Sequence, residues 1–218
     1  MLSYKERRFQ LILYGMSSII LVVLLAACQG DNGGGTSSAT ATPTSASTAT
    51  STLTPTATPI KVNLKLYVGV GYTIGYPAGW SVSTGTDGIV SFTDPKGGGY
   101  LAVTTQSNPQ GAISATDLVD TGLRVFRSQA QNYQQLTVNP TTTVAGETWS
   151  QGAATGDITP TGQTTSVTTQ VVVIADNHPP NSATTQGFTI AYGVDQQTFD
   201  FANQSYFQPM LQSFIFTS

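Results

Sequence analysis

The sequence predicts an α+β domain over residues 61–218, built on an antiparallel sheet that is covered by helices. Short alternating apolar runs separated by turn sequences are typical of antiparallel strands. One helical pattern interrupts these runs at residues 114–133, and a second follows them at residues 199–212. The resulting order of strands, helix, strands and helix is that of an α+β domain with helices packed on its sheet.

Turn sequences separate the first expected strands from one another. Pro77-Ala78-Gly79 is rich in turn residues. Asp87-Gly88 is a good hairpin turn, and residues 94–98, Asp-Pro-Lys-Gly-Gly, reverse the chain again. We therefore expect strands at residues 72–76, 80–83, 89–93 and 100–105.

The segment after the fourth strand carries the strongest helical pattern in the chain. Ser114 can serve as the N-cap, and Asp117 places a negative charge near the positive end of the helix. Apolar residues then recur at helical spacing. They predict one buried stripe, formed by Val119, Leu123, Phe126, Ala130 and Tyr133.

Strand-like runs resume after this helix. They occupy residues 135–138, 141–145, 147–153, 164–174 and 185–194. Ala145-Gly146 is expected to form a tight hairpin, and residues 156–162 a longer loop.

The last expected helix covers residues 199–212. Its predicted buried face consists of Phe199, Ala202, Tyr206 and Met210. Pro209 should kink this helix or separate a short final turn from it. Residues 213–216 can then end the chain as a strand.

The first 27 residues have the pattern of a bacterial lipoprotein signal peptide. Residues 5–8 include three basic side chains, and residues 11–27 contain no charge. The run ends in Leu25-Ala26-Ala27-Cys28, which resembles the lipobox, where cleavage precedes a cysteine that receives diacylglycerol. A transmembrane helix that is not cleaved is the alternative, because the 17 residues of this run are close to the lower limit for crossing a bilayer.

Both alternatives place the remaining chain outside the cytoplasm and attach it to the membrane. Residues 28–60 form the expected stalk, in which Thr, Ser, Ala and Pro occupy 23 of the 25 positions from Thr36 to Ile60. Such a segment cannot bury enough apolar surface to fold. We therefore expect a disordered spacer that spans on the order of 30 Å between the lipidated Cys28 and the domain.

Charge and cysteine content exclude several functions. Removal of residues 1–27 leaves five basic and ten acidic residues, a net charge of −5. Proteins that bind nucleic acids need clustered Lys and Arg, and the basic residues here are scattered, so we expect no nucleic-acid partner. Cys28 is the only cysteine, which excludes an intrachain disulfide and a thiolate metal cluster.

The sequence offers few candidates for catalysis or metal binding. His178 is the only histidine, and beside Asp176 it could act as a general base or a metal ligand. The surrounding prolines and asparagines favour a solvated surface turn instead, and a metal site usually needs three or four ligands. Asp195 and Asp200 could act as a carboxylate pair, although turn, cap or solvated positions are the simpler interpretation. We therefore expect no enzyme activity, no metal and no cofactor.

Two further motifs have structural interpretations. Residues 97–99, Gly-Gly-Gly, are not followed by the Lys-Ser/Thr of a phosphate loop, and we expect a flexible turn. The aromatic residues of the first half could line a ligand surface, but we expect much of this group to pack the sheet against a helix. They are Tyr67, Tyr72, Tyr76, Trp80, Phe92 and Tyr100.

Three segments of the domain resemble PsbP-like domains. Residues 72–80, Tyr-Thr-Ile-Gly-Tyr-Pro-Ala-Gly-Trp, are similar to the family's opening signature, and residues 90–95 to the strand and turn that follow. Residues 207–214 resemble its last helix, which ends in Ser-Phe. The resemblance covers nearly all of residues 66–218. It implies an α-β-α sandwich with a central antiparallel sheet, and binding or assembly roles without a shared catalytic residue set.

These observations favour a lipoprotein at the extracytoplasmic face of the cell membrane that displays a non-catalytic binding or assembly domain. Its expected partners are the membrane, through the lipid anchor, and an envelope protein. The alternatives are a carboxylate-dependent hydrolase of envelope or extracellular polymers and a carrier for a small ligand. The hydrolase would need two facing acidic side chains about 5–10 Å apart in a cleft, and the carrier a deep pocket.

Overall fold

The computed structural model describes residues 62–85, 87–97, 99–160 and 163–217. These residues belong to one compact unit of the chain. The expected signal peptide with its lipobox residues Leu25, Ala26 and Ala27, the lipidated Cys28 and the stalk lie outside the described residues. Their roles therefore stay predictions.

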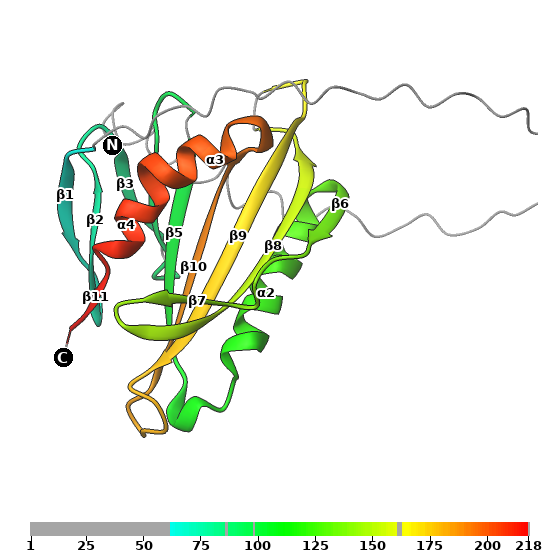
Figure 1. Ribbon diagram of the computed structural model, residues 1–218. Coiled ribbons are helices and arrows are strands. Elements are labelled where there is room, and N and C mark those ends of the chain that lie inside the picture. The colour runs from blue at the N-terminus through cyan, green and yellow to red at the C-terminus, as the bar shows by residue number, and fades with distance from the viewer. Residues whose placement is uncertain (1–61, 86, 98, 161–162, 218) are drawn as a thin grey trace, which may run out of the picture. The chain divides into compact units, whose positions relative to one another are not determined.

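Two antiparallel sheets form the framework of the domain (Figure 1). Among the described residues, the large sheet has eight strands. Seven follow one another in space as β3 (Ser81–Thr84), β4 (Val90–Thr93), β5 (Tyr100–Ser107), β10 (Gln186–Asp195), β9 (Val167–His178), β8 (Glu147–Ile158) and β6 (Gln131–Leu136). The eighth, β7 (Thr141–Val144), pairs with β8. The predicted α+β class is confirmed.

The small sheet was not predicted. It consists of β1 (Leu64–Val68), β2 (Tyr72–Pro77) and β11 (Ile215–Phe216), in the spatial order β1-β2-β11. Strand β2 was expected to belong to the same sheet as the strands that follow it. It pairs instead with the first strand and with the end of the chain, so the C-terminal residues close against the N-terminal part of the domain.

The turn sequences form the turns that they predict. Gly88, between β3 and β4, has φ of 79°, a conformation that glycine adopts readily. Ala145 and Gly146 have φ of 54° and 80° and join β7 to β8. Two successive residues with positive φ are the geometry of a two-residue hairpin whose twist matches that of its strands.

Helix α2 (Ala115–Gln129) begins as predicted but ends early. The Asp117 N–H donates a hydrogen bond to the Ser114 hydroxyl at 3.1 Å, so Ser114 is the N-cap. Three residues of the predicted stripe are buried, namely Val119, Leu123 and Phe126. The stripe is wrong beyond this point, because Ala130 is extended and Tyr133 lies in β6, which pairs with β8. Strand pairing overrides the helical spacing here, and the Tyr133 ring still packs 6.2 Å from that of Phe126.

The C-terminal helical segment continues through Pro209. Helix α3 (Phe199–Ala202), a π-helical turn (Asn203–Phe207) and α4 (Gln208–Gln212) follow one another without a break. Proline cannot donate a hydrogen bond to an earlier carbonyl, and the wider π-turn accommodates it without splitting the helix. The π-turn also shifts the buried face by one residue, so that Phe207 is fully buried and Tyr206 only partly.

Two apolar clusters hold the helices against the large sheet. Strand β9 contributes alternate residues to them, as expected when successive side chains point to opposite faces of a strand. The larger cluster takes Val172 and Ile174, and the smaller takes Val171, Val173 and Ala175. Helix α2 belongs to the smaller cluster, whereas α3, α4 and the small sheet belong to the larger one.

Strands β8 and β9 are longer than predicted. Strand β8 continues to Ile158, where a loop was expected from residue 156, because its last residues pair with β9. Strand β9 continues to His178, which pairs with Gln186 of β10. His178 itself therefore ends a strand, and the expected surface turn begins only after it, at Pro179. The sequence around His178 has the composition of a loop, but it pairs as a strand because the neighbouring strand β10 extends equally far.

Candidate functional site

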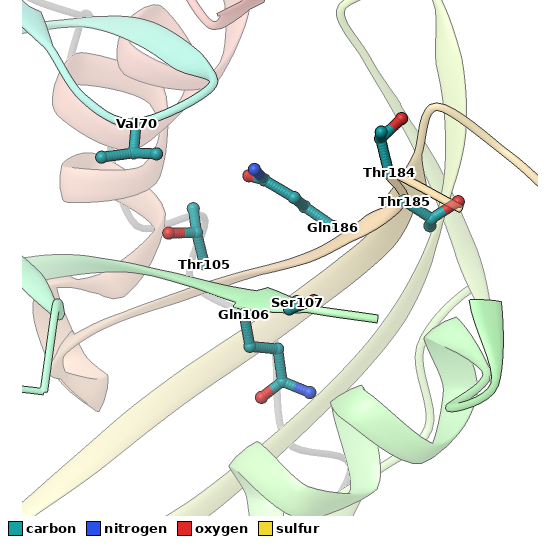
Figure 2. A pocket seen from close by; sticks show the side chains of 7 residues that line it. All are labelled: Val70, Thr105, Gln106, Ser107, Thr184, Thr185 and Gln186. Atoms are coloured by element: carbon teal, nitrogen blue, oxygen red, sulfur yellow. The ribbon is translucent and has the colours of Figure 1, made fainter. Parts of the chain in front are cut away.

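Two adjacent clefts open near the turn between β1 and β2, where β5 and β9 end and β10 begins. The first has a volume of about 420 Å³ and is lined by Val70, Thr105–Ser107 and Thr184–Gln186 (Figure 2). The second has a volume of about 460 Å³. It is lined by His178, Phe188 and Phe216 together with Gly71, Pro179 and Thr217. Thr184 and Gln186 line both clefts, which together form what we call the end cleft.

Strand register brings the end cleft together. Gln186 lies opposite Ser107 of β5 on one side and opposite His178 of β9 on the other. Side chains that face each other on neighbouring antiparallel strands lie on the same side of the sheet, about 5 Å apart. Three residues from three different strands thus form one row along the floor of the site.

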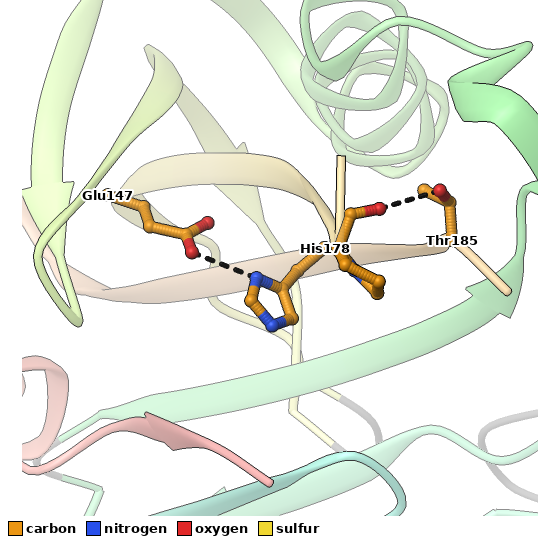
Figure 3. A network of polar contacts seen from close by, with 4 residues as sticks. Glu147, His178 and Thr185 are labelled. Atoms are coloured by element: carbon orange, nitrogen blue, oxygen red, sulfur yellow. Dashed lines mark hydrogen bonds and ion pairs between the residues drawn. The ribbon is translucent and has the colours of Figure 1, made fainter. Parts of the chain in front are cut away.

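His178 links the end cleft to the C-terminal strand. Its Nδ1 lies 2.9 Å from Glu147 Oε1, and its Nε2 points away from Glu147 (Figure 3). The imidazole stacks on the Phe216 ring with centroids 3.8 Å apart and an interplanar angle of 5°. The following turn is held by the Thr185 hydroxyl, which donates to the Pro179 carbonyl at 2.6 Å. Nε2 is therefore the imidazole nitrogen that can meet a ligand.

The carboxyl of Asp176 interacts with both Glu147 and His178. Burial and a hydrogen bond with Glu147 raise the pKa of Asp176 from 3.8 to about 6, and the charge of Glu147 acts in the same direction. Its Oδ2 has no donor in the described part of the chain. The carboxyl of Asp176 therefore keeps its proton to a higher pH than a solvated aspartate does, up to about pH 6.

Three more buried polar atoms lack a hydrogen-bond partner among the described residues. They are the Tyr72 hydroxyl, Trp149 Nε1 and Gln186 Oε1. The Trp149 ring stacks on Phe216, and Tyr72 lies opposite Phe216 in the small sheet, so both border the C-terminal strand. Each unsatisfied buried group costs about 1–3 kcal/mol. Their concentration near the end cleft makes this the candidate functional site.

The carboxylate pair considered from the sequence has structural roles. Asp195 caps a short 3-10 turn (Gln196–Thr198), and its Oδ1 accepts a hydrogen bond from the Gln197 N–H at 2.8 Å. Asp200 is exposed in the first turn of α3. These are the cap and solvated positions that were the simpler interpretation.

The aromatic residues in the first part of the domain mainly belong to the hydrophobic core, as predicted. Tyr72, Trp80 and Phe92 are buried, and Tyr67 and Tyr76 pack against them. Burial also raises the pKa of the Tyr100 hydroxyl to about 12. In the glycine turn, Gly97 and Gly99 have φ of 82° and 133°, whereas Gly98 is outside the described residues.

The sequence did not indicate Glu147, Gln186 or Phe216 as site residues. Glu147 lies 31 positions before His178 and meets it only because β8 and β9 pair in one particular register. The hairpin at Ala145-Gly146 was a usable signal, since it places Glu147 at the start of a strand. The register itself depends on long-range packing and cannot be read from local patterns.

The end cleft offers a ligand neutral hydrogen-bonding groups, one imidazole nitrogen and an aromatic surface. Within the described ranges, there is no group of three or more His, Cys, Asp or Glu side chains that could hold a metal ion. In the same part of the chain, no helix is long and apolar enough to cross a membrane.

The fold and the site define a small α+β domain with an open, largely neutral cleft at one end of an antiparallel sheet. Its fold is PsbP-like. The solution structure of cyanobacterial PsbP (CyanoP) from Synechocystis sp. PCC 6803 matches with a TM-score of 0.52 and 15% identity, over 76% of this chain and 99% of that chain. The resemblance expected from the sequence is therefore confirmed at the level of the fold.

Two other solved structures are more distant. A protein from Bacteroides thetaiotaomicron VPI-5482 matches with a TM-score of 0.43 and 9% identity over 73% of this chain and 50% of that one, so this chain spans about half its length. LpqN, involved in cell envelope biogenesis of Mycobacterium tuberculosis, matches with a TM-score of 0.35 and 10% identity over 74% of this chain and 87% of that one. Neither likeness supports an argument about function. No family model and no curated protein matches the sequence.

Proposed function

We propose that this protein is a lipoprotein at the extracytoplasmic face of the cell membrane, whose PsbP-like domain binds or helps to assemble an envelope protein without catalysing a reaction. The observation that carries the proposal is the end cleft. It is open, mostly neutral and bordered by buried polar groups that have no hydrogen-bond partner in the described part of the chain. Small-molecule sites bury most of their ligand in a concave pocket, whereas an open surface of this kind suits a protein partner.

The anchor in this proposal is the lipid on Cys28. Each buried methylene of an acyl chain contributes about 0.8 kcal/mol, and stable attachment needs two chains or a second signal. A diacylglyceryl cysteine supplies two chains. The stalk of residues 29–60 then holds the domain away from the lipid headgroups, within reach of an envelope partner.

The architecture that we propose is the α-β-α sandwich implied by the family resemblance. Its support is the alternation along β9, whose odd-numbered residues from 171 to 175 pack with α2 while Val172 and Ile174 pack with α3 and α4. Alternate side chains of a strand point to opposite faces. Helices would then cover both faces of the large sheet.

Replacement of the anchoring cysteine tests the localisation. In Cys28→Ala the protein should leave the membrane fraction or stay unprocessed, because alanine cannot receive diacylglycerol. A stalk variant, Ser37→Ala, should fractionate like the natural chain. Normal processing and membrane retention of Cys28→Ala would contradict the anchor.

Site-directed crosslinking in intact cells tests the binding role. A photoreactive residue at Thr184, in the end cleft, should capture the same envelope protein in repeated experiments. The control position is Gln129, an exposed residue at the C-terminal end of α2 that does not line the end cleft. An identical pattern from both positions, or no reproducible product from Thr184, would contradict the proposal.

The Asp176–Glu147 pair favours a second candidate function, hydrolysis of envelope polymers. A carboxyl with a raised pKa beside a second carboxyl is a common feature of acid–base catalysis. This candidate ranks second because the two groups contact each other, whereas glycosidases hold them about 5–10 Å apart. Release of reducing ends from purified envelope polysaccharide, abolished in both Glu147→Gln and Asp176→Asn, would replace the binding proposal.

A further inference from the structure

Strand β5 has a free edge beside the end cleft. Strand β10 pairs with all eight residues of β5, from Tyr100 to Ser107. On the other side, β4 pairs only with the first four, which end at Val103. Among the described residues, the segment 104–107 therefore has a neighbouring strand on one side only.

The backbone groups at this edge can be assigned residue by residue. The Asn108 N–H donates to the Thr185 carbonyl at 2.9 Å, so residues 108 and 185 form a hydrogen-bonded pair that continues the ladder between β5 and β10. Hydrogen-bonded pairs alternate along an antiparallel ladder. Residues 104 and 106 therefore bond to β10, whereas Thr105 and Ser107 point their N–H and C=O groups away from it.

The ladder on the other side of β5 gives the same assignment. The Asp94 N–H donates to the Gly99 carbonyl at 3.0 Å, which places the odd-numbered residues of β5 on the side of β4. Strand β4 occupies this side up to Val103. Beyond Val103, the N–H and C=O groups of Thr105 and Ser107 would be the next to pair with β4, if β4 were longer.

None of the residues at the free edge is a proline, a charged residue or part of a bulge. Natural proteins protect exposed edges with Pro, Lys, inward-pointing charges or bulges. The residues here are Thr104-Thr105-Gln106-Ser107, which carry no charge, and their register with β10 is continuous. Threonine is also favoured in strands. The edge is therefore suited to accept another strand.

The surroundings of the edge restrict what such a strand can carry. Thr105 and Ser107 line the first half of the end cleft, which provides about 420 Å³ of space. Val70 overhangs this space with 71% of its surface exposed, and the Gln186 amide extends towards it (Figure 2). None of the residues that line this half is charged. A charged side chain placed here would lose water without gaining an opposite charge.

We propose that the end cleft binds its partner by strand addition: an extended, uncharged segment of another polypeptide pairs with the Thr105–Ser107 edge and continues the line of β4. About four residues of the segment cover the edge at roughly 3.4 Å per residue. Main-chain hydrogen bonds to Thr105 and Ser107 provide affinity, and alternate side chains beside Val70 provide selectivity. The inference rests on the proposed binding function and specifies how the partner is held.

A capped, uncharged peptide tests this mode of binding on the full chain in detergent micelles. The probe is acetyl-Gly-Thr-Val-Thr-Val-Thr-Gly-amide with a fluorescent label, and its binding is followed by anisotropy. Its control is the same peptide with alternate backbone nitrogens methylated, which leaves the protein unchanged. Thr105→Pro removes the edge N–H at a position that does not bond to β10, and Thr105→Val is the matched variant that keeps this N–H.

Strand addition predicts saturable binding of the unmethylated peptide to the natural chain. The affinity should be about tenfold lower for the methylated peptide and for Thr105→Pro. For Thr105→Val it should stay within about twofold of the affinity of the natural chain. Bound peptide should slow hydrogen exchange at the Thr105 and Ser107 amides, and hardly change it at residues 104 and 106. Equal binding of both peptides, absence of this protection, or protection by a second copy of the chain without peptide would overturn the inference. If these results fail while Thr184 still crosslinks an envelope protein, strand addition is wrong and the proposed function stands.

Discussion

Asp176→Asn should remove a pH-dependent loss of stability that the structure assigns to a single carboxyl. In the folded protein, burial and the contact with Glu147 raise the pKa of Asp176 from 3.8 to about 6. The folded state therefore holds this proton more tightly than the unfolded state does. Its contribution to stability is complete below about pH 3.8 and is lost as the pH rises through about 6.

The size of the effect follows from the two pKa values. Their difference corresponds to at most about 3 kcal/mol. Because Asp176 is only partly buried, solvent screening reduces the expected value to about 1–1.5 kcal/mol. Asn has nearly the same shape and does not titrate. The free energy of unfolding of the variant, relative to that of the natural chain, should therefore rise by this amount between about pH 4 and pH 7.5.

Urea unfolding of both full chains at four pH values in this range measures the difference by linear extrapolation. Asp157→Asn is the control. Hydrogen bonds from Thr168 and Asn132 lower the pKa of Asp157 from 3.8, so its contribution is present above this unfolded value and is lost only as the pH falls below it. The difference between this variant and the natural chain should therefore stay nearly constant between about pH 4 and pH 7.5. A flat difference for Asp176→Asn, or an equal rise in both variants, would refute the reasoning.

Three further substitutions test the fold by the same unfolding measurement. Ser114→Ala removes the hydrogen bond from the Asp117 N–H and should lower stability by about 1 kcal/mol; no change would mean that the cap is unimportant. Gly156→Ala would place a Cβ 2.6 Å from the Cβ of Ala130, and overpacking should cost about 1–3 kcal/mol. Ala145→Asn relieves a φ of 54° and should add about 0.5–1 kcal/mol, whereas a loss would contradict the hairpin assignment.

The local elements were predictable because their signals are local. The cap at Ser114 and the hairpin at Ala145-Gly146 depend on neighbouring residues alone. Errors arose where a distant partner decides the outcome. Tyr133 follows the helical spacing but lies in β6, which pairs with β8, and His178 lies in a loop-like sequence but ends β9 beside β10.

The end cleft shows the same limit more clearly. His178 and Asp176 were recognised as the chemically interesting residues, but the sequence gives no reason to place Glu147 beside them. Phe216 reaches His178 only because the last two-residue strand pairs with β2 rather than with a neighbour in sequence. The free edge of β5 depends on where β4 stops, which is a property of two strands together.

Local patterns in the sequence were enough to predict the α+β class, most of the strands, the start of α2 and the absence of an intrachain disulfide. These follow from composition, periodicity and turn residues, which act over a few positions. The register of β8, β9 and β10, the closing of the chain end onto β2 and the backbone groups of Thr105 and Ser107, which have no neighbouring strand among the described residues, came from the tertiary structure. Backbone hydrogen bonds are chemically alike along a strand, so packing across the whole sheet selects which of them meet.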